Sequence, residues 1–254
     1  MQNSQDLSGR RAVITGGAAG LGYAIAQKLA QAGADITVID VAPSLDSVTL
    51  PGDWNAADID LGASDSLDKL RELAGHLGSV DVVVANAGIV PPWRSVADLD
   101  PQEWQRVMAV NTWGVAATLA GFSSALTTAG HGSVVVMASI NGYKAHPSQT
   151  LYTASKHAAI GIMRCAALDL GTKRIRVNAL APGPVATPAL VQRIDDRHAS
   201  GGPDPQSAFS ALDAQTALGE IVSPDQVASA ALWLASDASA GVTGIVLPVE
   251  AGLG

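Results

Sequence analysis

Cysteine is nearly absent from the 254-residue sequence, which contains only Cys165. A single cysteine cannot form a disulfide within the chain, and such a low count is typical of a reducing compartment. No apolar run reaches the 18 residues that suggest a membrane-spanning helix, and residues 1–6 lack the apolar core of a signal peptide. We therefore expect a cytoplasmic protein that neither spans nor binds a membrane.

Positive charge and aromatic residues are also scarce. The chain has 15 Lys and Arg against 23 Asp and Glu, a formal net charge of -8, and only 4% aromatic residues. No Lys/Arg cluster alternates with aromatics, so nucleic acid is not an expected partner. The five His residues are scattered without metal-ligand spacing, so we expect no metal site.

What the chain does contain is a large apolar fraction, 48%, spread along its whole length. Apolar periodicity runs to the C-terminus without a linker, which predicts a single domain over residues 1–254. The longest and most polar connection covers residues 188–222, and a connection of this length in a compact domain is usually functional or mobile.

A glycine-rich turn follows the first predicted strand, residues 11–15, and precedes a predicted helix that begins at Tyr23. The order of strand, glycine turn and helix is the context of a dinucleotide site, where glycine lets the backbone approach the pyrophosphate. The glycines at 16, 20 and 22 are spaced Gly-x-x-x-Gly-x-Gly, which differs from the generic Gly-x-Gly-x-x-Gly pattern.

Asp40 ends the second predicted strand, 18 positions after Gly22. A carboxylate at this place can accept hydrogen bonds from the adenosine ribose, and it would repel the 2′-phosphate of NADP. Neither residues 16–22 nor residues 41–45 contain Lys or Arg to neutralise such a phosphate. The sequence therefore favours NAD over NADP, although a solvated acid at a strand end would have the same pattern.

Tyr152 and Lys156 are four residues apart, so a phenol and an ammonium share one helical face. A cation about 4 Å from the phenol would contribute roughly 4 kcal/mol at an effective dielectric of 20, enough to bring the tyrosine pKa toward neutrality. The pair could then exchange a proton with an alcohol. A surface pair on an amphipathic helix is the alternative reading of this spacing.

Polar and small residues follow two further predicted strands, residues 80–84 and 132–137. Ligands of doubly wound sheets bind outside the carboxyl ends of the strands, which is where these residues lie. Asn111 falls inside a predicted helix that runs from Pro101 into the 120s, and there it could equally be a solvated or packing residue.

The order of these motifs resembles the short-chain dehydrogenase/reductase family over essentially the whole chain, and the glycine spacing is the one this family uses. The resemblance rests on residues 15–22, Asn86, Ala87, Gly88, Asn111, Ser139, Tyr152, Lys156 and residues 182–187. It implies an α/β Rossmann fold with a doubly wound, seven-stranded parallel sheet in the order 3-2-1-4-5-6-7. Pro248 independently suggests that the last strand lies at an edge, because proline cannot donate to a ladder.

The resemblance also implies catalytic roles for four residues. Tyr152 exchanges the proton, Ser139 orients the substrate oxygen, Lys156 binds the nicotinamide ribose and lowers the tyrosine pKa, and Asn111 holds a water that connects Lys156 to solvent. Besides Tyr152 and Lys156, the implied cofactor contacts come from the glycine turn, the turn after the fourth strand, the adenosine-side residues at the ends of the second and third strands, and the segment after the sixth strand: Gly16, Ala19, Gly20, Leu21, Asn86, Ala87, Gly88, Asp40, Asp60, Leu61, Pro182, Val185 and Thr187. Residues 188–222 would lie over the substrate as a lid.

The expected reaction is reversible hydride transfer between NAD and a secondary alcohol or ketone, with Ser139, Asn141, His146 and Trp93 as candidate substrate contacts. The polar lid stretch 193–198 favours a small hydroxylated substrate, such as a sugar, polyol or cyclic alcohol, although solvent-facing charge explains it equally well. Two alternatives stay open: an NADPH-dependent reductase of carrier-bound ketoacyl groups, and a catalytically silent binding protein. A homotetramer is expected from the resemblance alone.

Two positions depart from the family pattern. Ala85 stands where the family often has a first asparagine, which weakens the hydrogen bonding expected of that turn. Residues 249–252 read Val-Glu-Ala-Gly where Val-Asp-Gly-Gly is commoner, so the contacts of this segment are an open question.

Overall fold

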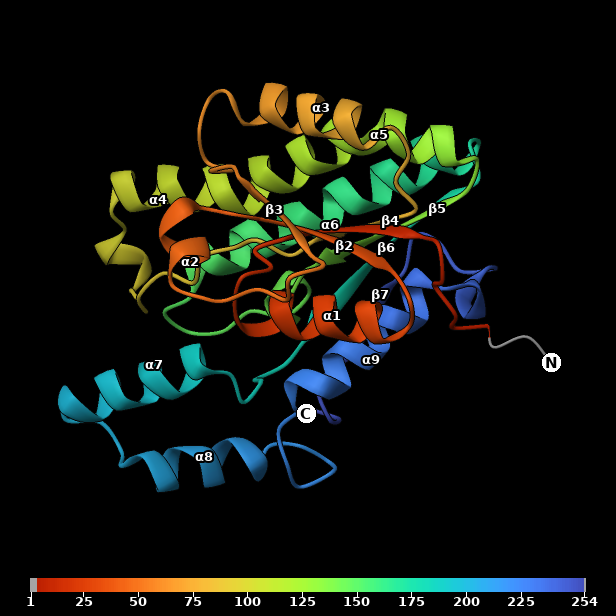
Figure 1. Cartoon of the computed structure of the whole chain (residues 1–254). Coiled ribbons are helices and arrows are strands. Elements are labelled where there is room, and N and C mark those ends of the chain that lie inside the picture. Colours follow the sequence, from red (N-terminus) through yellow and green to blue (C-terminus); the bar gives the residue numbers. More distant parts are fainter. Residues whose placement is uncertain (1–3, 254) are drawn as a thin grey trace.

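A single parallel sheet organises the chain, and the computed structural model describes residues 4–253 (Figure 1). Its seven strands lie in the order β3-β2-β1-β4-β5-β6-β7, which confirms the doubly wound topology. The strands are β1 (Arg11–Thr15), β2 (Asp35–Asp40), β3 (Asn55–Asp58), β4 (Val82–Ala85), β5 (Gly132–Met137), β6 (Ile175–Pro182) and β7 (Val246–Val249). The order reverses between β1 and β4, so a crevice for a ligand is expected at their carboxyl ends.

Alternate residues of each central strand enter two separate cores. Val13 packs into one core, whereas Ala12 and Ile14 pack into the other. The same alternation places Val134 and Val135 on opposite faces. Both faces are covered, which explains why these strands read as continuous apolar runs.

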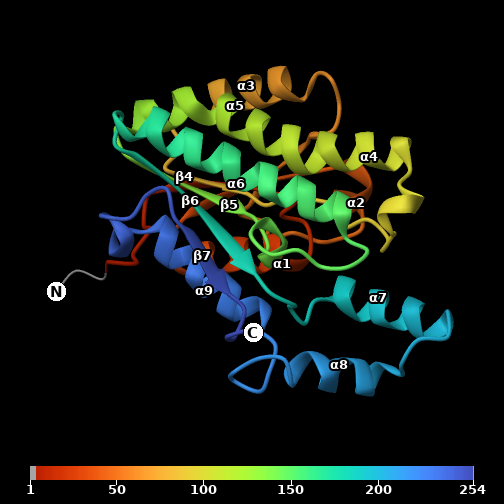
Figure 2. The ribbon, with the colours of Figure 1, turned by 180° about the vertical axis from the view of Figure 1, so that it is seen from behind.

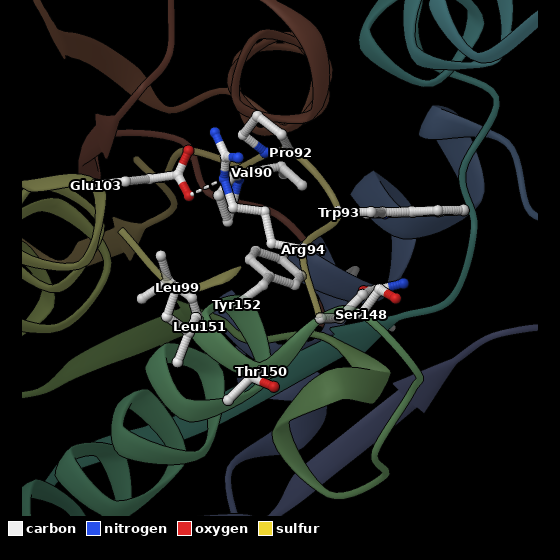
Figure 3. A pocket seen from close by; sticks show the side chains of 12 residues that line it. Val90, Pro92, Trp93, Arg94, Leu99, Glu103, Ser148, Thr150, Leu151 and Tyr152 are labelled. Atoms are coloured by element: carbon white, nitrogen blue, oxygen red, sulfur yellow. Dashed lines mark hydrogen bonds and ion pairs between the residues drawn. The ribbon is translucent and has the colours of Figure 1, made fainter. Parts of the chain in front are cut away.

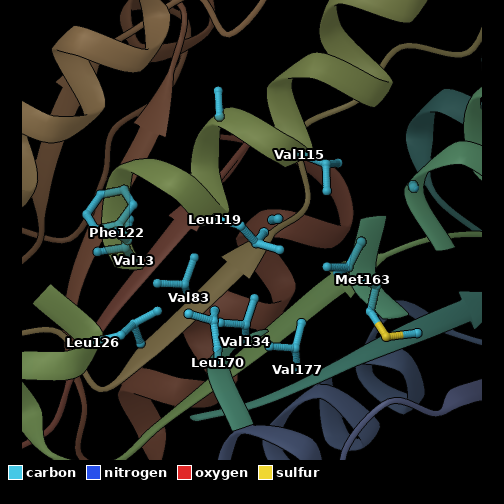
Figure 4. Close-up of a cluster of buried hydrophobic side chains, with 14 of the residues drawn as sticks. Val13, Val83, Val115, Leu119, Phe122, Leu126, Val134, Met163, Leu170 and Val177 are labelled. Carbon is cyan, nitrogen blue, oxygen red and sulfur yellow. The ribbon is translucent and has the colours of Figure 1, made fainter. Parts of the chain in front are cut away.

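Helices cover the two faces as separate layers (Figures 1 and 2). One face carries α3 (Ser66–Leu77), α5 (Gly114–Ala129) and α6 (Thr150–Gly171), and the other carries α1 (Gly20–Gln31) and α9 (Pro224–Ala235). Figure 4 shows how side chains of α5 and α6, among them Phe122 and Met163, meet valines of the sheet. The long α6 thereby anchors its first turns at the carboxyl edge of β5.

The segment that was expected to form a lid contains two helices that extend from the body of the molecule (Figure 2). They are α7 (Pro188–Ala199) and α8 (Pro205–Asp213). Val185 and Val222 form an isolated β-bridge, so the two ends of the segment that contains α7 and α8 lie side by side. The remaining short elements are α2 (Ala42–Asp46), α4 (Pro101–Met108) and 3-10 turns at Val96–Asp98, Ile140–Gly142 and Asp237–Ser239.

The helix expected from Pro101 into the 120s is continuous, but a π-helical turn, Ala109–Trp113, separates α4 from α5. A π turn in mid-helix commonly marks a functional site, and this one contains Asn111. β7 lies at the sheet edge, with Pro248 opposite Ala181, as proline requires. Among residues 4–253, no helix is both long and apolar enough to cross a bilayer.

Candidate active site

Ser139, Tyr152 and Lys156 come together at the carboxyl end of β5. Ser139 follows that strand by two residues, and Tyr152 and Lys156 occupy the first two turns of α6. The Lys156 Nζ atom donates a hydrogen bond of 2.8 Å to the Met137 carbonyl and lies 5.7 Å from the centroid of the Tyr152 ring. The lysine is thus oriented by the end of β5 as well as by its own helix.

The electrostatics of this pair differ from the sequence-based expectation. Burial raises the pKa of Tyr152 above its ordinary value, while hydrogen bonding to Ser139 and the charge of Arg193 act in the opposite direction. Burial also lowers the pKa of Lys156 to about 8. The expected lowering of the tyrosine pKa by Lys156 was therefore wrong for the protein alone, because desolvation outweighs the nearby charges and the ammonium faces the Met137 carbonyl.

A side-chain network holds Ser139 in place. Its Oγ accepts a hydrogen bond from the Asn141 backbone N–H (3.2 Å) and donates to Asn141 Oδ1 (3.4 Å). The Nδ2 group of Asn141 in turn donates to Gln149 Oε1 (2.8 Å) and Thr153 Oγ1 (3.1 Å). Asn141 therefore connects the serine to the start of α6, and a direct contact between Asn141 and substrate stays a prediction.

The side chain of Asn111 lies fully buried in the π turn and is tied to the loop after β4. Its Oδ1 accepts from the Ile89 N–H (2.8 Å), and its Nδ2 donates to the Ile89 carbonyl (2.9 Å) and to Ser155 Oγ (3.2 Å). Asn111 is therefore at least a packing residue, because its side-chain amide connects the loop after β4 to α6. The role of Asn111 in a water path to Lys156 stays a prediction.

The turn between β1 and α1 fits a dinucleotide backbone. Gly20 has φ +56° with open space where a Cβ would stand, so phosphate oxygens could approach the N-terminus of α1. At Gly16 a Cβ would lie 2.8 Å from the Ala87 Cα, so only glycine allows the two turns to touch. Ala19 precedes α1 without a side-chain cap, which leaves the first N–H groups available.

Thr15 and Asn86 join this turn to the end of β4, a connection that the sequence analysis did not identify. The Thr15 hydroxyl accepts from the backbone N–H groups of Asn86 and Ala87, both at 3.0 Å. Asn86 Nδ2 donates to the carbonyls of Thr15 and Gly16, both at 3.0 Å. With Ala85 in β4, the turn is therefore held by Thr15 and Asn86 rather than by two asparagines.

Asp40 ends β2 beside the glycine turn. Its carboxylate accepts hydrogen bonds from the backbone N–H groups of Ala18 (3.1 Å) and Val41 (2.9 Å). A carboxylate has about four acceptor sites, so capacity remains for ribose hydroxyl groups. The residues present thus fit the adenosine half of a nicotinamide dinucleotide.

The other expected cofactor residues lie along the same carboxyl edge. Gly88 is the closest to the catalytic residues, because a Cβ there would lie 3.3 Å from Asn111 Oδ1 and 3.6 Å from Lys156 Nζ. The remaining members are Leu21 in α1, Asp60 and Leu61 after β3, Pro182 at the end of β6, Val185 at the β-bridge, and Thr187, whose hydroxyl caps α7. Their contacts with a cofactor stay predictions.

Trp93 and Tyr152 line one small pocket between the loop after β4 and the start of α6 (Figure 3). The Arg94 N–H donates to the Ser148 carbonyl (2.9 Å), which holds the two loops together. Trp93 is half-exposed and stacks with two guanidinium groups of α7, those of Arg193 (5.4 Å to the ring centroid) and Arg197 (5.0 Å). Arg193 begins the polar stretch 193–198, in which no local pattern distinguishes it from the other lid charges.

His146 is half-buried, and its Nε2 has no hydrogen-bond partner among residues 4–253. This leaves it available to a ligand, and its contact with substrate stays a prediction. Within the same residues, no group of three or more His, Cys, Asp and Glu side chains is arranged to hold a metal ion.

The C-terminal segment pairs with the base of the expected lid. Backbone N–H groups of Ala217 and Leu218 donate to the carbonyls of Gly252 (3.0 Å) and Ala251 (3.1 Å). The neighbouring Glu250 packs against Gly183, where a Cβ would lie 2.8 Å from the Glu250 Cβ. The departure at residues 249–252 therefore falls in a strap that fixes the end of the lid.

Comparison with known proteins identifies the family. Residues 16–254 match a family model described as enoyl-(acyl carrier protein) reductase. The chain is 34% identical over 251 residues to cis-4-hydroxycyclohexanecarboxylate dehydrogenase of Sinomonas cyclohexanicum, covering 96% of each chain.

Two solved structures share the fold over nearly their full length. Carveol dehydrogenase of Mycobacterium avium in complex with NAD matches with a TM-score of 0.87 and 30% identity, over 97% of this chain and 98% of that one. A 3-oxoacyl (acyl-carrier-protein) reductase of Agrobacterium tumefaciens C58 with NADP bound matches with a TM-score of 0.87 and 29% identity, over 98% and 96%. With the sheet order and the Ser139, Tyr152 and Lys156 constellation, these matches show that the chain belongs to the short-chain dehydrogenase/reductase family of oxidoreductases acting on CH–OH groups.

Proposed function

We propose that this enzyme transfers a hydride reversibly between NAD and the carbinol carbon of a small polar secondary alcohol or the corresponding ketone. The observation that carries the proposal is the convergence of Ser139, Tyr152 and Lys156 beside Gly88, at the carboxyl end of the sheet. Sugars, polyols and cyclic alcohols are the expected substrate classes. The name of the Sinomonas cyclohexanicum relative, a dehydrogenase of a cyclic hydroxy compound, supports the cyclic class.

The protein contributes proton transfer and orientation to this reaction. In oxidation, the Tyr152 phenolate accepts the hydroxyl proton of the alcohol, and the Ser139 hydroxyl donates to the developing alkoxide. Lys156, whose ammonium lies 5.7 Å from the centroid of the Tyr152 ring, binds the nicotinamide ribose. The bound nicotinamide supplies the hydride acceptor, or the hydride donor in the reverse direction.

Asp40 is the basis for preferring NAD. Its carboxylate lies at the end of β2, where the 2′-phosphate of NADP would add roughly -1.5 to -2 charges beside it. Hydrogen bonds from the backbone N–H groups of Ala18 and Val41 hold this carboxylate in place, so a 2′-phosphate would lie directly beside it.

A reductase of carrier-bound ketoacyl groups is the second candidate function, favoured by the similarity to the 3-oxoacyl (acyl-carrier-protein) reductase of Agrobacterium tumefaciens C58. That function would use NADPH and a basic surface for docking an acidic carrier. A net charge of -8 and the position of Asp40 both favour the first proposal.

The test is a nicotinamide absorbance assay with NAD and NADP against a panel of sugars, polyols, cyclic alcohols and 3-ketoacyl thioesters. We expect NAD-dependent oxidation of a member of the alcohol classes and no turnover by Tyr152→Phe, whereas NAD affinity survives in that variant. Near-normal activity of Tyr152→Phe would contradict the assignment. Thioester reduction with NADPH would select the second candidate.

A further inference from the structure

Helix α7 places an arginine against Trp93, which lines the same pocket as the catalytic tyrosine. The Arg193 side chain is half-buried and stacks on Trp93 with its guanidinium carbon 5.4 Å from the ring centroid, and its charge acts to lower the pKa of Tyr152. We infer that Arg193 binds a carboxylate of the substrate, so that the enzyme acts on hydroxycarboxylates and their keto acids. The inference rests on the proposed function and names its substrate class.

Arg193 has no anionic partner within residues 4–253, where no ion pair or hydrogen bond to its guanidinium occurs. The adjacent acid Asp196 instead accepts a hydrogen bond from Gln192 Nε2 (2.9 Å). By contrast, Arg94 in the facing loop is paired with Glu103 at 3.0 Å. A half-buried guanidinium without a counterion is costly, because burial disfavours its charge and the contact with the Trp93 ring offsets only part of that cost.

The position of Arg193 indicates where the missing anion comes from. The glycine turn at the start of α1 and Asp40 at the end of β2 fit the cofactor phosphates and adenosine ribose, whereas Arg193 stacks on Trp93, which lines the pocket of Tyr152, where the reacting carbinol must lie. The anion is therefore part of the substrate. A single planar guanidinium matches a carboxylate in a bidentate pair, which fixes the orientation of the alcohol as well as attracting its charge.

The contact with Trp93 restricts the conformational freedom of the Arg193 side chain. Stacking on the indole face restricts the guanidinium plane and leaves its N–H edge free for hydrogen bonds. Arg197, one turn further along α7, stacks on the same ring at 5.0 Å but is exposed, whereas Arg193 is half-buried. The two arginines thus form a matched pair on one ring, of which only Arg193 is partly withdrawn from solvent.

The experiment compares a hydroxycarboxylate with its neutral carboxamide, for example 4-hydroxycyclohexanecarboxylate and 4-hydroxycyclohexanecarboxamide, in the NAD-loaded enzyme. The wild type is expected to prefer the carboxylate by roughly 10- to 100-fold in kcat/KM, the range of a charge-assisted hydrogen bond. Arg193→Leu loses this preference, Arg193→Lys retains part of it, and Arg197→Leu keeps it. Any change in the Tyr152 pKa in Arg193→Leu affects both substrates alike, so the ratio isolates the carboxylate contact.

Binding of the keto acid and of its carboxamide to the enzyme–NAD complex, measured by calorimetry, gives a second readout that needs no turnover. Absence of hydride transfer with every alcohol would overturn the proposed function, whereas loss of keto acid binding in Arg193→Leu alone would still support the inference. Equal affinity of the wild type for acid and amide, equal effects of Arg193→Leu and Arg197→Leu, or a preference for a phosphorylated alcohol would each overturn it.

Discussion

Lys156 is a buried cation whose ammonium donates to the Met137 carbonyl, and it forms no ion pair with a carboxylate within residues 4–253. Its pKa of about 8 lies below the ordinary 10.5 because burial disfavours the ammonium. Lys156 therefore lowers the stability of the folded protein although it is needed for the proposed reaction, a stability–activity trade-off that is common at active sites.

Replacing it with an apolar residue of similar length should therefore stabilise the enzyme while abolishing turnover. Below pH 8 the Lys156 ammonium is charged in both the folded and the unfolded protein, so folding must bury the charge. The decrease in pKa from 10.5 to about 8 corresponds to a loss of up to about 3 kcal/mol in the free energy of unfolding. Between pH 8 and 10.5 the unfolded chain binds more protons than the folded one, so wild-type stability rises with pH and the cost disappears.

Denaturant unfolding of the wild type and Lys156→Met at pH 7 and pH 10.5 measures this difference. We expect the variant to be more stable at pH 7 and the advantage to shrink at pH 10.5. Lys69, an exposed lysine paired with Asp65, gives the control variant Lys69→Met, which should show no such gain. A lower stability of Lys156→Met at both pH values would show that the Met137 contact outweighs the burial cost.

At the scale of elements, the C-terminal strap contains a non-glycine residue in a left-handed conformation. Ala251 has φ +57°, at the position where the family more commonly has glycine. An L-residue in this region costs roughly 1–2 kcal/mol, and glycine avoids that cost at a smaller loss of chain entropy. The strap is therefore strained where it pairs with the base of the lid.

Ala251→Gly is expected to stabilise the protein by about 0.5–1 kcal/mol, as measured by chemical unfolding. The matched control is Ala120→Gly, at an exposed site inside α5, which should destabilise by about 1 kcal/mol because the helical conformation offers glycine no advantage. If Ala251→Gly loses as much stability as the control, the positive φ carries no strain.

At the scale of the whole molecule, α6 presents an exposed face that nothing within residues 4–253 covers. Leu168 on this helix is 79% exposed, and a Cβ on Gly161 would meet open space. Small or apolar residues recur along this face at Ala154, Ala158, Gly161, Cys165 and Leu168. Such a face is suited to close packing with a second helix, which supports the proposed homotetramer.

Light scattering after size exclusion should give a mass of about four 25.7 kDa subunits for the wild type and a smaller assembly for Leu168→Arg. Val191→Arg, at an exposed apolar site on α7, should leave the mass unchanged. A wild-type monomer, or an unchanged mass for Leu168→Arg, would contradict the proposed role of the α6 face.

The sequence alone determined the order of elements and the identity of the central residues. Strand runs such as residues 132–137 and the glycine turn are local patterns, so their positions could be predicted from the sequence. The spacing of Ser139, Tyr152 and Lys156 indicated the chemistry for the same reason, because each belongs to a motif a few residues long.

Only the tertiary structure determined the pKa shifts of those residues and their contacts with distant elements. The direction of the Tyr152 pKa shift depends on burial, the ammonium of Lys156 donates to a carbonyl of another element, and Arg193 of α7 stacks on Trp93 beside the site. Asn111 lies in a π turn, where its amide pairs with the backbone of Ile89. Desolvation and contacts between distant elements have no local pattern, so no stretch of sequence could reveal them.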